Sequence, residues 1–289
     1  MDCRLTPGRP RILDGAMGTE LIARGMIVRQ DIAERWVIDR PDDVREIHVA
    51  YAQAGAQVLQ TNTFGAIRAR LAPHDLSDRI VEICGRAIEL ARGLERPVVA
   101  SLGPSGLPGD STEIEAQLAE SASALRSADA IHLETQCHPE ELLAAARGIR
   151  SGAPDLPLWI SITVVAADAG LVTPLGVPID RMIRALREAA PDAVGVNCSL
   201  DAERIRGAVE RLVDADLGPV LARPQARISQ KCATGQSTET PERFATRAME
   251  LFGLGVAAVG GCCGTHPGSI EALSQAFSGT KPAEIRVSP

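Results

Sequence analysis

Residues 192–216 read DAVGVNCSLDAERIRGAVERLVDAD and contain one full period of the pattern that runs through the chain. The first part, 192–199, is a short apolar run that ends in Asn197 and Cys198. The second part, 201–216, places Arg and Glu on one side of an apolar stripe, as an amphipathic helix does. The stretch therefore predicts a buried strand followed by a helix, with two polar side chains at the end of the strand.

The same alternation recurs along the sequence. Strands are expected at 11–17, 56–63, 96–103, 129–135, 157–163, 192–199, 218–225 and 256–263. Helices are expected at 41–55, 77–94, 112–128, 139–152, 178–191, 201–216 and 240–255, and residues after 264 look like the start of another. Eight such units without a break in composition predict a single (β/α)8 TIM barrel. The predicted domain spans residues 1–289, with a core of about 10–275 and short tails.

Composition excludes several classes of protein. The formal net charge is -7 and the basic residues are not clustered, so nucleic acid is not an expected partner. The start of the chain lacks the apolar core of a signal peptide, and no stretch approaches the roughly 18 apolar residues of a membrane span. We therefore expect a cytoplasmic protein without a membrane partner.

In such a barrel the polar residues at the ends of the strands converge on one mouth, where function concentrates. These candidates are Asp14, Asn62, Thr63, Ser101, Glu134, Thr135, Ser161, Thr163, Asn197, Cys198, Cys262 and Cys263.

Three cysteines among them suggest a metal site. The sixth and eighth strands are two positions apart around a barrel, so Cys198 can meet the adjacent pair Cys262 and Cys263. Three thiolates with a free fourth position are typical of a catalytic zinc ion, whereas a structural zinc has four protein ligands. Both members of the pair can reach one ion only if the strand ends there, because successive strand residues point to opposite faces. The alternative is that these cysteines are small buried hydrophobic residues.

The other four cysteines carry weaker signals. Seven cysteines in a chain without a secretory signal indicate reduced thiols rather than a disulfide framework. Cys84 lies in a predicted helix and Cys3 in the N-terminal tail. Cys137 and Cys232 lie in loops; Cys137 is close enough to the mouth to be a spare ligand, although a neutral thiol is the simpler interpretation.

Five motifs carry a resemblance to a known family: ILDGAMGTEL (12–21), QTNTFGA (60–66), ET (134–135), GVNCS (195–199) and GGCCGT (260–265). In order and spacing they resemble the zinc-dependent homocysteine S-methyltransferases. That barrel family includes betaine- and S-methylmethionine-dependent enzymes and the homocysteine module of cobalamin-dependent methionine synthase. The resemblance covers about residues 10–275.

The resemblance implies a function and a set of site residues. It implies Zn2+ bound by Cys198, Cys262 and Cys263, and methyl transfer to homocysteine to give methionine. Asp14 and Glu134 correspond to the acidic residues that hold the amino-acid end of homocysteine. Further residues expected at this pocket are Gly15, Ala16, Met17, Asn62, Thr63 and Asn197.

The chemistry of a thiol agrees with this function. A free thiol is mostly protonated at neutral pH, whereas zinc coordination removes the proton and presents a thiolate that can attack a methyl group. Other roles remain open for the polar residues: Asp14 can form a turn, Glu134 can pair with an arginine, and Asn62 and Asn197 can satisfy loop backbone.

Two features depart from the family pattern. After the seventh strand the family commonly has a PNAG- or PNSG-like turn, but here Arg223–Arg227 reads RPQAR, with Gln225 in place of the asparagine. His132 is two residues before Glu134, hence on the same face of its strand, where relatives usually have an apolar residue. It is either an extra ligand or a hydrogen-bonded interior histidine. The other histidines, His48, His74, His138 and His266, are expected at helix or loop surfaces.

The methyl donor is the open partner. Aromatic residues make up only 2% of the chain, and Phe64 and Trp159 are the ones near strand ends. An aromatic cage for a cationic donor is therefore not expected. The candidates are a small sulfonium, betaine or a separate methyl-corrinoid protein.

Four alternatives compete with this function. A Schiff-base aldolase needs a lysine at a strand end, and Lys231 and Lys281 are not placed there. A phosphate-binding barrel enzyme would use the glycines after the eighth strand. A related thiol or selenol acceptor would keep the zinc chemistry, and a zinc-sensing protein would bind metal without catalysis.

Overall fold

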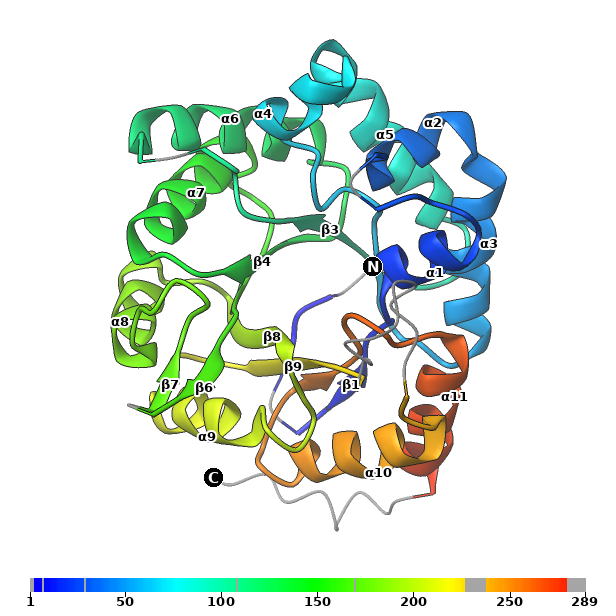
Figure 1. Ribbon diagram of the computed structural model, residues 1–289, viewed down its shortest axis with the longest axis vertical. Coiled ribbons are helices and arrows are strands. Elements are labelled where there is room, and N and C mark those ends of the chain that lie inside the picture. The colour runs from blue at the N-terminus through cyan, green and yellow to red at the C-terminus, as the bar shows by residue number, and fades with distance from the viewer. Residues whose placement is uncertain are drawn as a thin grey trace.

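Eight parallel strands close into a barrel in the computed structural model of the chain (Figure 1). The structure describes residues 3–6, 8–28, 30–107, 109–168, 170–226 and 238–279. The order around the sheet is β1-β10-β9-β8-β5-β4-β3-β2. A parallel bridge between Leu13 and Val58 joins the two ends of this order. The predicted barrel is confirmed.

The strands lie within or close to the predicted ranges. They are β1 (Arg11–Ile12), β2 (Leu59–Gln60), β3 (Val98–Leu102), β4 (Ala130–Gln136), β5 (Leu158–Ile162), β8 (Ala193–Asp201), β9 (Val220–Gln225) and β10 (Ala258–Val259). β10 ends three residues before Cys262, so the strand does end before the cysteine pair. A short antiparallel hairpin, β6 (Val165–Ala167) and β7 (Gly170–Val172), was not predicted and follows β5.

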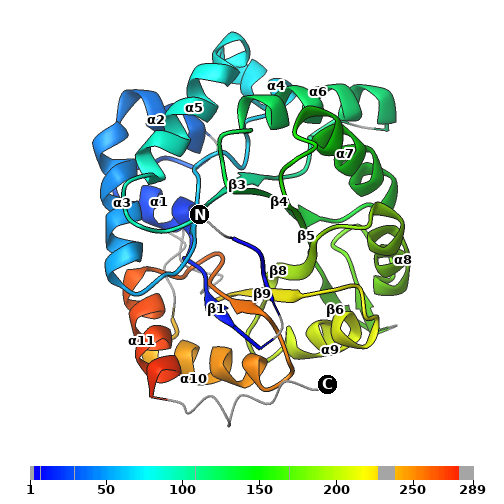
Figure 2. The same ribbon diagram turned by 180° about the vertical axis from the view of Figure 1, so that it is seen from behind.

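The helices form the outer ring, as the views from both ends show (Figures 1 and 2). Those matching the predicted ranges, with the helix start after 264, are α3 (Pro41–Gln53), α5 (Ile80–Ala91), α6 (Ser111–Ala124), α7 (Pro139–Gly152), α8 (Ile179–Ala189), α9 (Arg206–Asp214), α10 (Pro241–Phe252) and α11 (Pro267–Ser278). Shorter helices in the loops after β1 and β2 are α1 (Met17–Ala23), η1 (Ala33–Arg35), α2 (Trp36–Asp39), α4 (Arg68–Leu71), η2 (Ala72–His74) and η3 (Ser77–Arg79).

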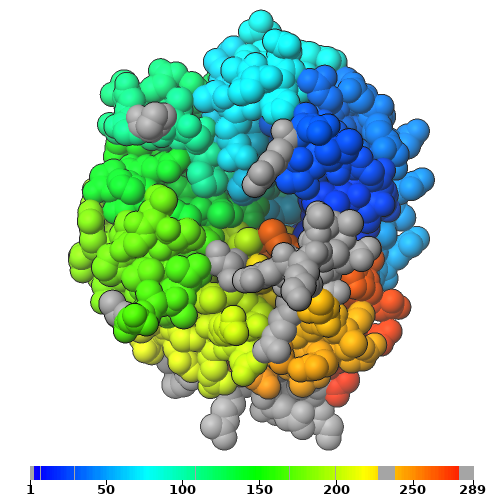
Figure 3. All heavy atoms as spheres, in the orientation of Figure 1, coloured from blue at the N-terminus to red at the C-terminus, as the bar shows by residue number. Residues whose placement is uncertain are grey.

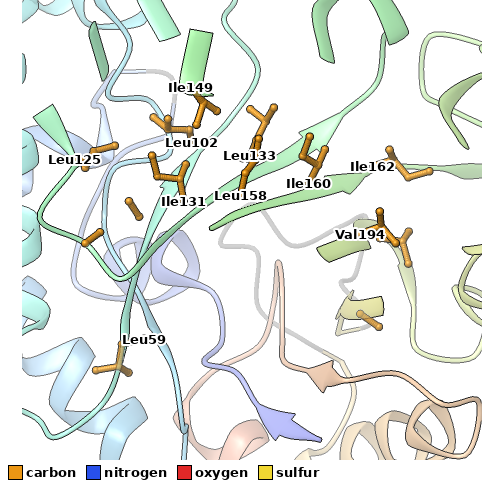
Figure 4. Packing of buried hydrophobic residues seen from close by; sticks show 14 of the residues in the cluster. Leu59, Leu102, Leu125, Ile131, Leu133, Ile149, Leu158, Ile160, Ile162 and Val194 are labelled. Carbon is orange, nitrogen blue, oxygen red and sulfur yellow. The ribbon is translucent and has the colours of Figure 1, made fainter. Parts of the chain in front are cut away.

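The main core lies between the strands and the helix ring. Alternate residues of β4 and β5, such as Ile131, Leu133 and Ile160, pack against helix residues such as Ile149 (Figure 4). A second buried cluster fills one end of the barrel interior. It includes Leu13, Val99, Trp159 and Leu221, and the N-terminal residues Cys3 and Leu5 pack into it. This cluster forms an apolar floor in the barrel, and Cys3 is part of it. The sequence had shown only that Cys3 lies in the N-terminal tail.

The barrel interior becomes polar toward the carboxyl ends of the strands. In β4 the inward face continues from Ala130 to His132 and Glu134, all buried, and in β9 it continues from Leu221 to Arg223. The polar groups thus sit between the apolar floor and the mouth formed by the βα loops.

One histidine lies in a different environment from the one that the sequence predicted. His48 was expected at a helix surface, and that is wrong: it is fully buried in α3, where burial lowers its pKa to about 3. Lys231, Lys281 and Cys232 lie outside the described residues. Within the described part of the chain, no helix is both long and apolar enough to cross a membrane.

Candidate active site

Three cysteine side chains meet at the mouth of the barrel. The sulfur atoms of Cys198, Cys262 and Cys263 all lie within 4.8 Å of one another. The sulfurs of Cys198 and Cys263 are 3.4 Å apart. None of the three forms a disulfide, and their exposure rises from half-buried at Cys198 and Cys262 to exposed at Cys263. The structure thus brings together the three residues that the sequence singled out.

This geometry fits a tetrahedral metal ion. Two sulfurs at the usual Zn–S distance of about 2.3 Å are about 3.8 Å apart at a tetrahedral angle. The separation of 3.4 Å between Cys198 and Cys263 is close to that value, and the other two separations are no more than 4.8 Å. Soft thiolate ligands favour zinc over Mg2+ or Ca2+.

The proximity of the three thiols also affects their protonation. The pKa of Cys262 is raised to about 12, first by its hydrogen bond with Cys198 and further by burial. The pKa of Cys263 is raised by its hydrogen bonds with Cys198 and Cys262. Three thiolates this close repel one another, so a cation is required to hold them deprotonated together.

Glycines shape the loop that carries Cys262 and Cys263. Gly264 has a left-handed φ of 79°, whereas Gly260 and Gly261 are needed for close approach. A Cβ on Gly260 would lie 2.7 Å from the carbonyl oxygen of Asp14, and one on Gly261 would lie 2.3 Å from Oγ1 of Thr265. The loop therefore owes its left-handed step to Gly264 and its tight packing to Gly260 and Gly261.

The third cysteine sits in an unusual backbone conformation. Cys198 has a φ of 59° and lies where the register of β8 shifts between Asn197 and Asp201. Thr135 in β4 has a φ of 64°, also at a register shift. Left-handed residues other than glycine are uncommon and cluster at functional sites.

Asn197 joins these two irregular strands. Its Oδ1 accepts a hydrogen bond from the backbone N–H of Thr135 at 2.9 Å. Its Nδ2 donates to Oγ1 of Thr135 at 2.8 Å and to Oε2 of Glu134 at 3.2 Å, and lies 4.0 Å from the Cys262 sulfur. Asn197 is fully buried and does not line the cavity described next, so its position fits orientation of neighbours rather than direct contact with a ligand.

A cavity of about 560 Å³ opens beside the cysteines. Its wall includes Gly15, Ala16, Met17, Asn62, Phe64, Ser101, Glu134, Thr135, Cys198, Arg223, Cys262 and Cys263. The space-filling view shows the surface hollowed at this end of the barrel, with atoms from the C-terminal part of the chain inside the hollow (Figure 3). Such a volume is typical of small-molecule sites.

Glu134 lies in the cavity wall and is held by three hydrogen bonds. Its Oε1 accepts from Nε2 of Gln60 at 2.6 Å and from Oγ of Ser101 at 2.5 Å. The third comes from Asn197 to Oε2. Burial raises the pKa of Glu134 to about 7, and the charge of Arg223 partly offsets that rise. Among the described residues Glu134 forms no salt bridge, so the expected alternative of an arginine pair is not seen.

Asp14, by contrast, is already paired. Its Oδ1 accepts from Nη1 of Arg223 at 3.0 Å, and its Oδ2 accepts from the backbone N–H of Gln60 at 2.6 Å. Burial raises the pKa of Asp14, and Arg223 and the Gln60 N–H oppose that rise. Asp14 does not line the cavity, whereas Arg223 does.

Arg223 and Gln60 were not among the predicted site residues. Strand alternation was the available signal, because Arg223 is two residues after the inward-facing Leu221, and Gln60 is two after Val58. Arg223 belongs to the departure noted at 223–227, of which Arg227 lies outside the described residues. The first residue of this departure is therefore a buried cation within β9.

His132 is an interior histidine held by hydrogen bonds. Its Nε2 lies 2.7 Å from Oγ of Ser161, and its Nδ1 lies 3.3 Å from Oε1 of Gln60. Gln60 donates through Nε2 to Glu134, so its Oε1 accepts and the proton of His132 is on Nδ1. His132 does not line the cavity, and burial lowers its pKa.

The remaining predicted residues divide between wall and interior. Asn62 lines the cavity and donates to the carbonyl oxygen of Ala33 at 2.7 Å, whereas Thr63 is fully buried and donates to that of Ser101 at 2.7 Å. Phe64 lines the cavity, but Trp159 lies in the barrel floor. Cys137 is outside the cysteine cluster, and burial raises its pKa to about 11.

The loop after β10 is poorly suited to bind phosphate. Its N–H groups are used within the protein: Gly260 donates to Ala222, Gly261 to Asp14, and Cys262 to Pro224. Gly264 donates to Oγ1 of Thr19. A phosphate cradle needs such N–H groups to point at the ligand. This arrangement disfavours the phosphate-binding alternative.

The fold and the site together define a class: a TIM barrel with a cluster of three thiols that could hold a metal ion, beside a small-molecule cavity. The chain belongs to the homocysteine S-methyltransferase family, which matches residues 11–277. The resemblance drawn from the five motifs is confirmed.

Individual relatives agree with this assignment. Methionine synthase of Mycobacterium tuberculosis is 29% identical over 310 residues, covering 97% of this chain and 26% of that protein. Methionine synthase of Mycobacterium leprae is 30% identical, covering 93% of this chain and 24% of that protein. The metallated form of the homocysteine methyltransferase MmuM from Escherichia coli superposes with a TM-score of 0.76 at 25% identity, covering 92% and 96% of the two chains. The chain thus spans about a quarter of the length of the curated relatives it matches.

Proposed function

We propose that this chain transfers a methyl group to the sulfur of homocysteine and forms methionine, using Zn2+ bound by Cys198, Cys262 and Cys263. The observation that carries the proposal is the cysteine cluster at the edge of a cavity whose wall also holds buried charged side chains. Family membership supports the acceptor, and the three-sulfur donor set supports zinc.

Each part of the site has a task in this reaction. When bound, the zinc ion would lower the pKa of the acceptor thiol and so supply a thiolate at neutral pH. The cavity wall formed by Gly15, Ala16 and Met17 encloses the amino-acid end of the acceptor. Glu134 lies beside the cysteines and provides a negative charge for the ammonium group, and Asn197 orients Glu134.

The donor is a small sulfonium, betaine or a methyl-corrinoid protein. The cavity is large enough for homocysteine and a small second molecule. Phe64, with Arg70 stacked at 5.1 Å, is an aromatic ring in the wall, so a complete aromatic cage is not formed by the described residues. The exposed position of Cys263 also leaves the sulfur site open to a large donor. A related thiol or selenol acceptor is the second candidate, because the cysteine cluster suits either.

The six described cysteines form no disulfide, which fits a reducing compartment, and we place the protein in the cytoplasm on that basis. We also infer that residues 1–289 act as one catalytic barrel, since the strands that carry the site are drawn from its whole length.

The first test combines metal content with methyl transfer. The purified chain should contain about one zinc per molecule by mass spectrometry, and homocysteine with a panel of donors should yield methionine. Replacing Cys262 or Cys263 by alanine should remove both the zinc and the activity, because two sulfurs do not complete the site.

Cys137→Ala is the matched control, because this cysteine lies outside the cluster. It should keep zinc and activity. A Cys262→Ala protein that methylates homocysteine at the wild-type rate without metal would refute the proposal, and zinc binding without homocysteine binding would favour the sensor alternative.

A further inference from the structure

Two opposite charges line the cavity next to the cysteine cluster. Glu134 and Arg223 both belong to the cavity wall, and both are more than nine-tenths buried. The charges of both act on Cys262, which places them beside the sulfurs. Burying a charge is costly unless a partner compensates it, so each of these groups needs one.

The partners inside the protein are unevenly distributed. Arg223 donates from Nη1 to Asp14 at 3.0 Å and from Nη2 to the carbonyl oxygen of Gly15 at 3.4 Å. Its Nε is buried and has no hydrogen-bond partner among the described residues. A guanidinium has five N–H donors, so part of its capacity is not used by the described residues. Among the described residues, the donors to Glu134 are all neutral: Gln60, Ser101 and Asn197.

The carboxylate of Asp14 is occupied within the protein. Both of its oxygens are engaged, by Arg223 and by the Gln60 backbone, and it does not line the cavity. A ligand therefore meets the guanidinium of Arg223 where the sequence suggested a second carboxylate. An amino acid carries one ammonium and one carboxylate on the same carbon, which matches one carboxylate and one guanidinium in the wall.

We propose that Arg223 binds the carboxylate of the acceptor amino acid, opposite the ammonium already assigned to Glu134, and that Asp14 acts as a positioning residue for Arg223. This assignment rests on the proposed function, since it takes homocysteine as the acceptor. It makes Arg223 the residue that selects acceptors with a carboxylate.

The test uses the zinc-loaded full chain and three thiols. Homocysteine has both charged groups, 3-aminopropane-1-thiol lacks the carboxylate, and 4-sulfanylbutanoate lacks the amine. Dissociation constants measured by calorimetry need no methyl donor. Arg223→Met should weaken homocysteine and 4-sulfanylbutanoate about 10- to 100-fold, as loss of a hydrogen bond to a charged group does. It should change 3-aminopropane-1-thiol less than about threefold.

Further variants separate binding from folding. Glu134→Gln should give the reverse pattern, weakening the two amines and sparing 4-sulfanylbutanoate. Arg223→Lys keeps a charge for Asp14 but loses the planar fork, and Arg223→Met with Asp14→Asn leaves no unpaired buried carboxylate. Both should reproduce the selective loss. Arg147→Met removes an exposed arginine paired with Glu115 and should change none of the three affinities.

Two outcomes would overturn the inference, and they differ from failure of the proposed function. Equal weakening of all three thiols by the folded, zinc-loaded Arg223 variants would show a merely structural role. Unchanged homocysteine affinity in those variants would also refute it. A wild-type protein that binds zinc but none of the thiols would instead remove the proposed function, and this assignment with it.

Discussion

The carboxylate of Glu134 is buried and forms no salt bridge with any other described residue. Its pKa is raised to about 7, chiefly because burial disfavours the charged form. In the unfolded chain it returns to its ordinary value of 4.5. The folded state therefore binds this proton more tightly than the unfolded state does, and the resulting stability is present below pH 4.5 and lost as the pH rises through about 7.

Glu134→Gln should remove this pH dependence. Between pH 5 and pH 8 the free energy of unfolding of the wild type should fall relative to that of the variant by roughly 1 to 3 kcal/mol. Urea denaturation of both proteins at the two pH values measures the difference. Glu115→Gln, at an exposed carboxylate, should run parallel to the wild type. A constant difference between wild type and Glu134→Gln across this range would contradict the argument.

At the scale of single elements, the loop after β10 shows what tight packing does for the site. The Cβ of an alanine at 260 would lie 2.7 Å from the carbonyl oxygen of Asp14 and 2.7 Å from Cβ of Leu13. Both atoms belong to the two residues directly after β1. A carbonyl oxygen and a Cβ cannot move aside as the end of a flexible side chain can. The loop must therefore shift, and it carries Cys262 two residues later.

Gly260→Ala should destabilise the fold and weaken the metal site. The expected loss is about 1 to 3 kcal/mol of unfolding free energy, as for overpacking in a core. Zinc retention during dialysis against a weak chelator should fall as well. Gly85→Ala in α5 is the matched control, because no atom lies within 4 Å of the added Cβ and alanine favours helices. Full stability and zinc retention in Gly260→Ala would show that the loop tolerates the shift.

The elements also show where sequence reasoning succeeded. Apolar runs followed by amphipathic segments located all eight barrel strands, because the hydrophobic pattern follows from burial against the helix ring. The cysteine cluster followed from strand order, since positions 198 and 262 fall two strands apart. The hairpin β6–β7 was missed because its strand residues, 165–167 and 170–172, are exposed or half-buried and carry no buried pattern.

The charge arrangement was harder to predict. Asp14 and Glu134 are both acidic residues after strands, and the sequence could not show that one is neutralised. That difference depends on Arg223, which reaches Asp14 across 209 residues of sequence. Similarly, the role of His132 depends on Gln60 and Ser161, which come from two other strands.

At the scale of the whole molecule, the apolar floor fills one end of the barrel interior. The cavity lies at the other end, where the βα loops are. Cys3, Leu5 and Trp159 pack into that floor. The three clustered cysteines come from β8 and from the loop after β10, so an ion held by them would tie the sixth and eighth strands of the barrel together. Any ligand that binds only the folded state stabilises it.

Zinc should accordingly raise the melting temperature of the whole barrel. At about 1,000 times its dissociation constant a ligand adds about 4 kcal/mol, which for a domain of this size is a shift of about 5 to 10 °C. Calorimetric scans before and after chelator treatment measure it. A Cys198→Ser, Cys262→Ser, Cys263→Ser protein should show no shift with zinc, and Cys84→Ser should retain one. Equal shifts with and without the three cysteines would place the zinc elsewhere.

The residues of the cavity wall differ in solvent exposure, and this difference affects how the methyl donor is selected. Arg223 and Glu134 lie deep, while Cys263 reaches the surface. An acceptor seated as proposed enters charged end first and leaves its sulfur outermost. The deep part of the cavity then recognises the acceptor, and the outer part meets the donor. A new donor requires changes only in the rim loops, and an inhibitor that extends outward from the sulfur of methionine would occupy both depths at once.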